Sequence, residues 1–188
     1  MFAYEEAIGY CCGSVVKDKD GISAAAILAE MVIQLREEGK TLSSHLSDLK
    51  ERYGYFVGKN SYVKFLDESV LQEIFDKVRN DKNYITEIGG VRVMGARDLT
   101  LGYDSSSEDG KSKLPSDPTS QFVTFTLENQ AVVSLRTSGT EPKLKYYIEA
   151  VGESEEEGKE MCERLAKAVL VDLIGVEKRG DKLEMPAA

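Results

Sequence analysis

QFVTFTLENQAVVSLRTSGTEPKLKYYIEAV, residues 121–151, is the part of the sequence from which a sheet can be predicted. Two apolar-rich runs of strand length, Phe122 to Leu127 and 131–135, stand close together in this stretch. A short turn at 128–130 separates these two runs, and LKYYIEAV follows as a further strand. The stretch therefore predicts a β-hairpin that continues through a second turn into another antiparallel strand.

The second turn lies within RTSGTEPKLKYY, residues 136–147, and has the chemistry that an anion of phosphate size needs. Glycine lets the backbone turn so that successive N–H groups can point into one concavity, and hydroxyl groups add donors. An arginine before the turn offers a planar fork that matches two phosphate oxygens. The same composition is also typical of an ordinary hairpin turn. The residues concerned are Arg136, Thr137, Ser138, Gly139, Thr140, Lys143 and Lys145.

A second conspicuous stretch is FAYEEAIGYCCG, residues 2–13, which holds two adjacent carboxylates, Glu5 and Glu6. Adjacent side chains on an extended segment point to opposite sides, so at most one of them faces water easily. A buried or cleft-facing carboxylate must be paired or used, and neighbouring sugar hydroxyls are natural partners for it. The alternative is a carboxylate at a strand end that caps a loop.

Two helices are expected between these stretches. Residues 20–38 predict a helix that begins at Asp20 as N-cap, and 42–52 predict another. The first half of the 20–38 helix is apolar nearly all round, so we expect it to be buried against a sheet or other helices. Only about one strand of sequence precedes it. The receiving sheet is therefore expected to come from sequence outside the chain, with Met1 beginning a shortened protein.

The remaining segments predict an α+β fold. The mixed segment 53–66 is interpreted as an extended hinge, and Asp67 caps a helix. That helix has a buried stripe of Val70, Leu71, Ile74, Phe75 and Val78. Residues 90–103 are strand-like, 104–120 form a mobile surface loop, and 154–174 form a closing helix. Four antiparallel strands with two helices on one face form an α+β layer.

Composition excludes several classes of function. A net charge of −9 argues against a nucleic-acid partner, and no apolar run is long enough for a membrane span. Three cysteines give neither a disulfide framework nor zinc spacing, which fits a reducing, cytoplasmic location. DKDG at 18–21 fits a turn before a helix better than a metal loop. His45 is expected to be a partly exposed helix residue rather than a ligand or base.

Together the two motifs make the chain similar to the C-terminal part of the α-D-phosphohexomutases, the phosphoglucomutase/phosphomannomutase superfamily. The chain looks most like the eukaryotic branch that contains phosphopentomutase/phosphoglucomutase and glucose-1,6-bisphosphate synthase. The segments that carry this resemblance are FAYEEAIGY, KDKDGISAAAILAE, RDLTLGYD and RTSGTEPKLKYY. They extend it over nearly the whole chain.

The resemblance implies three parts. Residues 1–52 would be the C-terminal remnant of the third, sugar-binding α/β domain. Residues 53–66 would be a hinge, and 67–188 the fourth, phosphate-binding domain with a TATA-binding-protein-like fold. The phosphate that is not transferred would be held by Arg136, Thr137, Ser138, Gly139 and Thr140, with support from Lys145. The sugar hydroxyls would be held by Glu5 and Glu6, while Glu141 would brace its own loop.

The resemblance also implies an intramolecular phosphotransferase, an isomerase that acts on pentose or hexose phosphates through a bisphosphate intermediate. The family's phosphoserine loop and Asp-x-Asp-x-Asp metal loop have no counterpart in this sequence, so no catalytic or metal residue is expected here. Mg²⁺ and a sugar bisphosphate activator would belong to the parent enzyme. The expected partners are the phosphosugar and the missing N-terminal domains of the parent.

Three positions depart from the wider family and favour the pentose-phosphate branch. Ala7 stands where many hexose mutases have serine, and Thr137 stands where many have proline. Lys145 replaces an arginine and can supply charge but no bidentate fork. Two alternatives stay open: a non-catalytic phosphosugar-binding fragment, and an interaction module that docks on a separate N-terminal half. The choices between pentose and hexose, and between mutase and bisphosphate synthase, also stay open.

Overall fold

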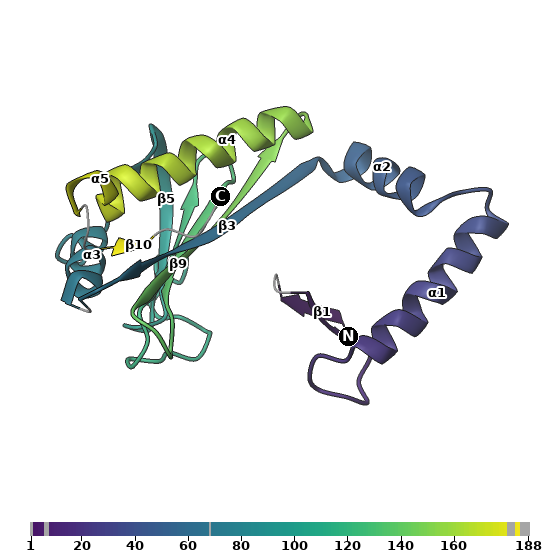
Figure 1. Cartoon of the computed structure of the whole chain (residues 1–188), viewed down its shortest axis with the longest axis horizontal. Helices are drawn as coiled ribbons and strands as arrows, with labels where there is room; N and C mark the ends of the chain where they lie inside the picture. Colours follow the sequence, from purple (N-terminus) through teal and green to yellow (C-terminus); the bar gives the residue numbers. More distant parts are fainter. Residues whose placement is uncertain (1, 6–7, 68, 180–182, 185–188) are drawn as a thin grey trace. The chain divides into compact units, whose positions relative to one another are not determined.

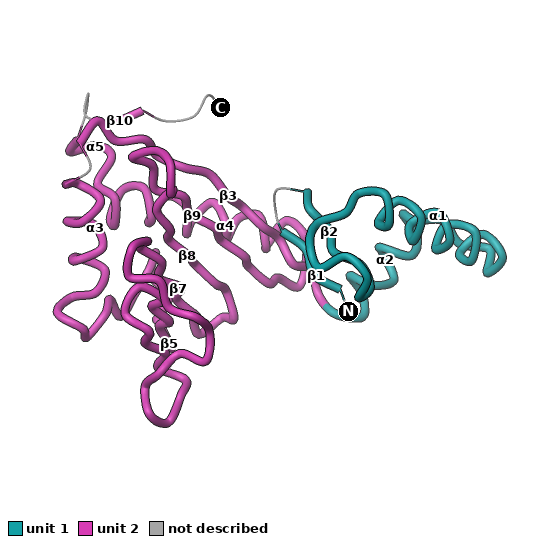
Figure 2. Tube along the Cα trace, turned by 90° about the horizontal axis from the view of Figure 1, so that it is seen from below, with its two compact units in different colours: residues 1–53 teal, residues 54–188 magenta. Residues whose placement is uncertain are grey.

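The structure is a computed structural model that describes residues 2–5, 8–67, 69–179 and 183–184. The chain divides into two compact units, Met1–Tyr53 and Gly54–Ala188 (Figure 2). Each unit has its own local structure and is described by itself. None of the described helices is both long enough and apolar enough to cross a membrane.

The first unit begins with an antiparallel hairpin of β1 (Phe2–Glu5) and β2 (Gly9–Cys12) (Figure 1). Two helices follow it, α1 (Gly21–Glu37) and α2 (Leu42–Tyr53). Asp20 is the N-cap of α1, because its carboxylate accepts a hydrogen bond of 3.0 Å from the Ile22 N–H. The predicted helices and the predicted cap are therefore confirmed.

Helix α1 exposes most of its apolar side chains. Leu35 is its one buried residue among those that the structure describes, whereas Ile22 is 83% and Ile33 60% exposed. The sequence predicts that this helix packs against a sheet. No such sheet is present among the described residues of the first unit, which holds the two-stranded hairpin.

The second unit is built around an antiparallel sheet, eight-stranded within the described residues (Figure 1). Its strand order is β10-β3-β9-β8-β7-β5-β4, and β6 pairs with β5. The strands are β3 (Tyr55–Phe65), β4 (Glu87–Ile88), β5 (Val91–Asp98), β6 (Tyr103–Asp104), β7 (Phe122–Leu127), β8 (Val132–Thr137), β9 (Lys143–Gly152) and β10 (Leu183–Glu184). The four predicted strands are β5, β7, β8 and β9, and they are neighbours in this sheet.

Strand β3 differs from the hinge that the sequence predicts over residues 53–66. It pairs with β9 over ten residues, from Tyr55 opposite Gly152 to Lys64 opposite Lys143. The boundary between the two units falls before it, between Tyr53 and Gly54. A pivot within 53–66 would have to break this pairing, so the hinge interpretation does not describe these residues.

The helices of the second unit are α3 (Ser69–Arg79), α4 (Glu155–Ala168), the π-helix η1 (Val169–Ile174) and α5 (Val176–Arg179). The Asp67 carboxylate accepts a hydrogen bond of 2.9 Å from the Ser69 N–H at the start of α3. All five residues of the predicted α3 stripe are buried, as expected. The predicted closing helix is observed as α4 followed by η1, with Ser154 as N-cap.

The two faces of the sheet have different compositions. On one face the strand residues are buried in a single hydrophobic core with α3 and α4, for example Phe125, Leu135 and Ile148. The alternate residues on the other face are half-buried or exposed, for example Thr124, Ser134 and Arg136. We call this second side the open face. Because α4 covers only the core side, polar side chains of β7, β8 and β9 can gather on the open face.

Candidate functional site

Strand register brings the two cations of the predicted turn together. Arg136 on β8 lies directly opposite Lys145 on β9, and directly opposed residues of antiparallel strands share one face of the sheet. Tyr62 on β3 lies opposite Lys145, and Phe122 on β7 lies opposite Arg136. We call these four residues, Tyr62, Lys145, Arg136 and Phe122, the cationic row. It crosses the open face next to the turn.

Arg136 is exposed and its guanidinium lies 5.8 Å from the centre of the Phe122 ring. Within the described part of the chain, neither Arg136 nor Lys145 forms an ion pair. The pKa of Asp117 is lowered mainly by a hydrogen bond from Thr119, and nearby Arg136 contributes to this shift. The row therefore carries two positive charges that form no ion pair among the described residues, and the Asp117 carboxylate is a charged neighbour of Arg136.

The turn itself is closed by backbone hydrogen bonds. The Ser138 N–H donates to the Lys143 carbonyl at 2.8 Å, and the Lys143 N–H donates to the Glu141 carbonyl at 2.7 Å. Among the described residues the N–H groups of Gly139 and Glu141 have no acceptor. Two free N–H groups in an exposed turn next to two cations are suitable for a small anion.

Gly139 departs from its expected role. The sequence predicts that glycine lets the backbone turn, but the φ of Gly139 is not in the left-handed region. A Cβ atom built on Gly139 would have no heavy atom within 4 Å. The turn is therefore made by ordinary backbone conformations, and glycine there leaves open space above the backbone.

Thr137 has a hydroxyl group that is already engaged. The Gln121 N–H donates to Thr137 Oγ1 at 3.1 Å, and the Thr137 N–H donates to the Gln121 carbonyl at 3.0 Å. These bonds fasten the first residue of the turn to the segment before β7. Ser138 and Thr140 lie further into the turn, where the Thr140 N–H approaches Ser138 Oγ at 3.4 Å.

Glu141 braces its own loop, as the sequence predicts. Its carboxylate forms ion pairs of 2.7 Å with Lys143 and 3.2 Å with Lys64. Hydrogen bonds from these two lysines lower the pKa of Glu141, so it stays ionised. The Lys143 ammonium also lies 4.1 Å from the centre of the Tyr62 ring. The one carboxylate of the turn is thus neutralised within its own loop.

The predicted sugar site lies in the first unit. Glu5 is exposed and forms an ion pair of 2.9 Å with Lys19, which raises the pKa of Lys19. Gly9 faces Glu5 in the hairpin, and a Cβ there would come within 2.4 Å of Lys19 Cδ and 2.9 Å of Glu5 Cγ. Glycine at this position therefore leaves room for the Glu5–Lys19 pair. Glu6, the second predicted carboxylate, and Ala7 lie outside the described residues.

Three residues that the sequence does not predict lie beside the candidate site residues: Lys19, Tyr62 and Phe122. Lys19 stands in the KDKDG segment, whose aspartates are the residues with possible metal-ligand chemistry. Tyr62 and Phe122 enter through strand register, which composition does not fix. His45 is half-buried on α2, as expected. No group of three or more His, Cys, Asp or Glu side chains in the described residues could hold a metal ion.

Models of known protein families match both units of the chain. Residues 77–168 match the C-terminal domain of the phosphoglucomutase/phosphomannomutase family, and residues 1–53 match its alpha/beta/alpha domain III. The human glucose 1,6-bisphosphate synthase is 41% identical over 177 residues, which cover 93% of this chain and 28% of that protein. The human phosphopentomutase is 45% identical over 152 residues, covering 79% of this chain and 25% of that protein.

A third relative, the probable phosphoribomutase of Schizosaccharomyces pombe, is 38% identical over 188 residues, covering 98% of this chain and 32% of that protein. The chain thus spans between a quarter and a third of the length of these relatives. The fold is α+β, and the two domain matches come from a single family of proteins. The chain belongs to this phosphoglucomutase/phosphomannomutase family, as the resemblance in its sequence predicts.

Proposed function

We propose that this chain is the sugar- and phosphate-binding C-terminal portion of a phosphosugar mutase that acts on pentose or hexose phosphates. The observation that carries the proposal is the placement of Arg136 directly beside Lys145 on the open face. Both cations lack an ion pair among the described residues, and both adjoin a turn with two free N–H groups. This arrangement fits the phosphate that is not being transferred.

Each group of proposed phosphate contacts would have a different role. Arg136 supplies a planar fork for two oxygens, and Lys145 supplies a point charge. The N–H groups of Gly139 and Glu141, with the hydroxyls of Ser138 and Thr140, would donate to the remaining oxygens. Glu141 would not repel the ligand strongly, because Lys64 and Lys143 neutralise its carboxylate.

The proposed sugar contact is the Glu5–Lys19 pair of the first unit. Ionised Glu5 accepts hydrogen bonds from sugar hydroxyls, and Lys19 can donate to them while remaining charged. Glu6 remains an expected contact outside the described residues. Since Ala7 has no hydroxyl group, the carboxylates and Lys19 would carry this recognition.

The contribution of this chain to catalysis would be positioning. Phosphoryl transfer depends mostly on alignment and on stabilisation of charge. A phosphate that is held at one end of the sugar would position the other end of the sugar for the transfer. Mg²⁺ and a sugar bisphosphate activator are proposed only for the parent enzyme. The described residues offer no cluster that fits a metal ion, so no step is assigned to a metal here.

Titration calorimetry of the 188-residue chain with ribose 5-phosphate tests the phosphate contact. We expect Arg136→Ala to weaken binding roughly 10- to 150-fold, about 1.5–3 kcal/mol, because a charge-assisted bidentate contact is lost. Arg92→Ala is the matched control, since Arg92 is an exposed arginine on β5 without an ion pair among the described residues. Equal affinity of both variants and the unmodified chain would refute the assignment.

A second role is favoured by the exposed apolar surface of α1. We propose that this surface packs against the sheet of a separate N-terminal part of domain III, since an alpha/beta/alpha layer needs such a sheet. The isolated chain should then bind a hydrophobic dye, and Leu28→Glu should reduce that binding. Unchanged dye fluorescence in the variant would argue against α1 as the docking surface.

A further inference from the structure

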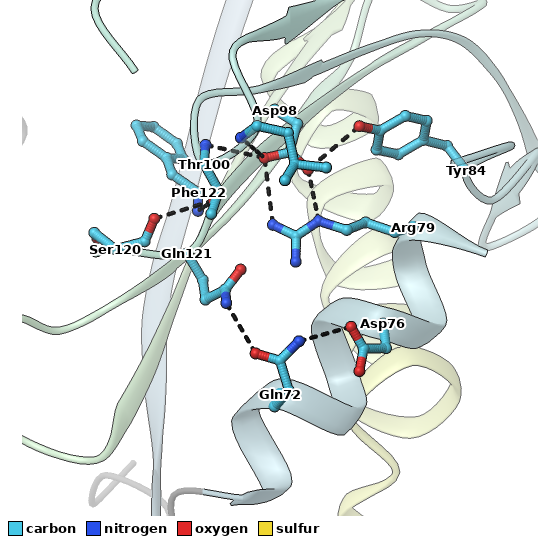
Figure 3. Close-up of polar contacts among 10 residues, drawn as sticks. Gln72, Asp76, Arg79, Tyr84, Asp98, Thr100, Ser120, Gln121 and Phe122 are labelled. Atoms are coloured by element: carbon cyan, nitrogen blue, oxygen red, sulfur yellow. Dashed lines mark hydrogen bonds and ion pairs between the residues drawn. The ribbon is translucent and has the colours of Figure 1, made fainter. Parts of the chain in front are cut away.

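The second unit buries an ion pair away from the proposed phosphate site. Arg79 at the end of α3 donates from Nε to the Asp98 carboxylate of β5 at 2.7 Å, and a second bond of 3.3 Å comes from Nη2 (Figure 3). The Asp98 side chain is fully buried and that of Arg79 is 9% exposed. Burying two charges is costly unless geometry is good and the remaining acceptors are satisfied.

Strained backbone surrounds this pair. In the segment that follows α3, four residues have φ between 45° and 69°: Asn80, Asp81, Lys82 and Tyr84. The last of these is an aromatic residue, for which the left-handed region is unusual. The Tyr84 N–H donates a hydrogen bond of 2.7 Å to the Arg79 carbonyl, and the Tyr84 hydroxyl donates one of 3.3 Å to the Asp98 carboxylate. Through these two hydrogen bonds, Tyr84 holds Arg79 and Asp98 in place.

From Asp98 a chain of hydrogen bonds leads to the cationic row. Asp98 Oδ1 accepts from the Thr100 N–H at 3.0 Å. Thr100 Oγ1 donates to the Ser120 carbonyl at 3.0 Å and accepts from the Phe122 N–H at 2.9 Å (Figure 3). The Phe122 ring lies beneath the Arg136 guanidinium. Each link therefore fixes the backbone or side chain of the next.

A second connection runs from α3 to the first residue of the turn. The Gln72 side chain donates to Asp76 at 2.7 Å and accepts from the Gln121 side-chain amide at 3.1 Å (Figure 3). The Gln121 backbone in turn bonds Thr137 in both directions. Both connections begin on α3 and end on residues that border or belong to the cationic row.

We propose that Thr100 is a positioning residue, through which the buried Arg79–Asp98 pair sets the place of Phe122 and thereby of the Arg136 guanidinium, with Gln72 and Gln121 holding the turn in parallel. The consequence for ligand affinity rests on the proposed function of the row. The positioning itself can be measured without a ligand.

The test compares Thr100→Val with Thr100→Ser in the full chain by NMR. A guanidinium over an aromatic ring has side-chain proton shifts displaced by the ring current, so the Arg136 Hδ and Hε signals report its place over Phe122. Thr100→Val removes the hydroxyl and should move these signals toward those of an unstacked arginine, whereas Thr100→Ser should keep them. Ribose 5-phosphate affinity should fall by about three- to tenfold in Thr100→Val only.

Thr124→Val is the matched control, because Thr124 lies on β7 close to Phe122 and its hydroxyl forms a hydrogen bond of 3.0 Å with Ser134 rather than with the network. It should leave the Arg136 signals unchanged. Gln72→Met offers a surface variant that is expected to fold, and it should shift the Thr137 amide signal.

Unchanged Arg136 signals in a folded Thr100→Val protein would overturn the positioning role. If Thr100→Val does not fold, an unshifted Thr137 amide in Gln72→Met would overturn the inferred link from α3. Moved Arg136 signals in a chain that does not bind ribose 5-phosphate would support positioning and refute the phosphate assignment. Failure of the positioning role and failure of the phosphate assignment would therefore give different results.

Discussion

At the scale of single residues, Gly139 shows how the turn is made. Its φ is not left-handed and its Cβ position is open, so alanine fits there without strain. We expect Gly139→Ala to keep or slightly raise the free energy of unfolding, by about 0–1 kcal/mol, because alanine reduces the entropy of the unfolded chain. Urea denaturation of the variant measures this. A loss of more than about 1 kcal/mol would show that glycine is required by the backbone.

Asp104 provides a residue-scale prediction about pH. Hydrogen bonds from Ser106, followed by one from Arg97 at 2.7 Å, lower the pKa of Asp104 to about 2. A carboxyl whose pKa is lower in the folded state stabilises the fold above its unfolded pKa, near 4. That stabilisation is lost as the pH falls from about 4 to about 2.

We therefore expect Asp104→Asn to reduce the free energy of unfolding at pH 7 by about 1–2 kcal/mol, with allowance for the exposure of Arg97. The difference from the unmodified chain should shrink toward zero at about pH 2. Urea unfolding of both proteins across this pH range measures the difference. A difference that stays constant with pH would contradict the ionic role of Asp104.

The sequence predicts which residue types would contact phosphate and sugar, but not which side chains lie beside those residues across the strands. Arg136, Lys145 and Glu5 were identified because their residue types suit phosphate and sugar. Phe122 and Tyr62 were not, because cross-strand neighbours depend on register, which is set by how β3, β7, β8 and β9 pair. The engaged Thr137 hydroxyl was missed for a similar reason, since its partner Gln121 lies 16 residues away.

At the scale of elements, β3 and α4 meet at an unusually close contact. A Cβ on Gly158 of α4 would come within 2.6 Å of Val57 Cγ2 and 3.2 Å of Val57 Cβ on β3. Cys162 one turn further along also donates from Sγ to the Val57 carbonyl at 3.1 Å. Glycine thus lets the helix lie against the strand.

We expect Gly158→Ala to reduce the free energy of unfolding by about 1–3 kcal/mol through overpacking, although alanine is the better helix former. Adding Val57→Ala should recover part of this loss, because it removes the clashing methyl groups. Gly58→Ala is a control on the same strand, where the nearest atom lies 4.0 Å away. Simple additivity of the two substitutions in denaturant unfolding would contradict the contact.

The element that the sequence misassigned is β3 itself. Its middle, Gly58–Lys59–Asn60–Ser61, has residues of low strand propensity, which favours a connecting segment. Pairing with β9 and the close contact with α4 override that preference. Helices α1, α2 and α3 and the β7–β8 hairpin were predictable because their caps, periodicity and turn lie within the local sequence.

At the scale of the whole molecule, the two units differ in how much they bury. The hydrophobic core cluster lies entirely in the second unit, from Val63 to Ile174. In the first unit the described part holds one buried apolar side chain, Leu35. A helix of 17 residues without a covered face is marginal by itself in water.

We therefore expect amide hydrogen exchange to divide the chain at Tyr53. Strands β8 and β9 should exchange by global opening, with a free energy of about 5 kcal/mol or more, and α1 should exchange much faster. Hydrogen–deuterium exchange with mass spectrometry measures both. Equal protection of α1 and β9 would contradict the division into one well-packed and one weakly packed unit.

An NMR titration of the chain with ribose 5-phosphate, with unphosphorylated ribose as control, tests whether the cationic row binds phosphate. We expect ribose 5-phosphate to shift the Arg136 and Lys145 side-chain signals and the amides of residues 138–141, and ribose to leave them unchanged. Absence of shifts at saturating phosphosugar, or equal shifts with ribose, would contradict the cationic row as a phosphate site.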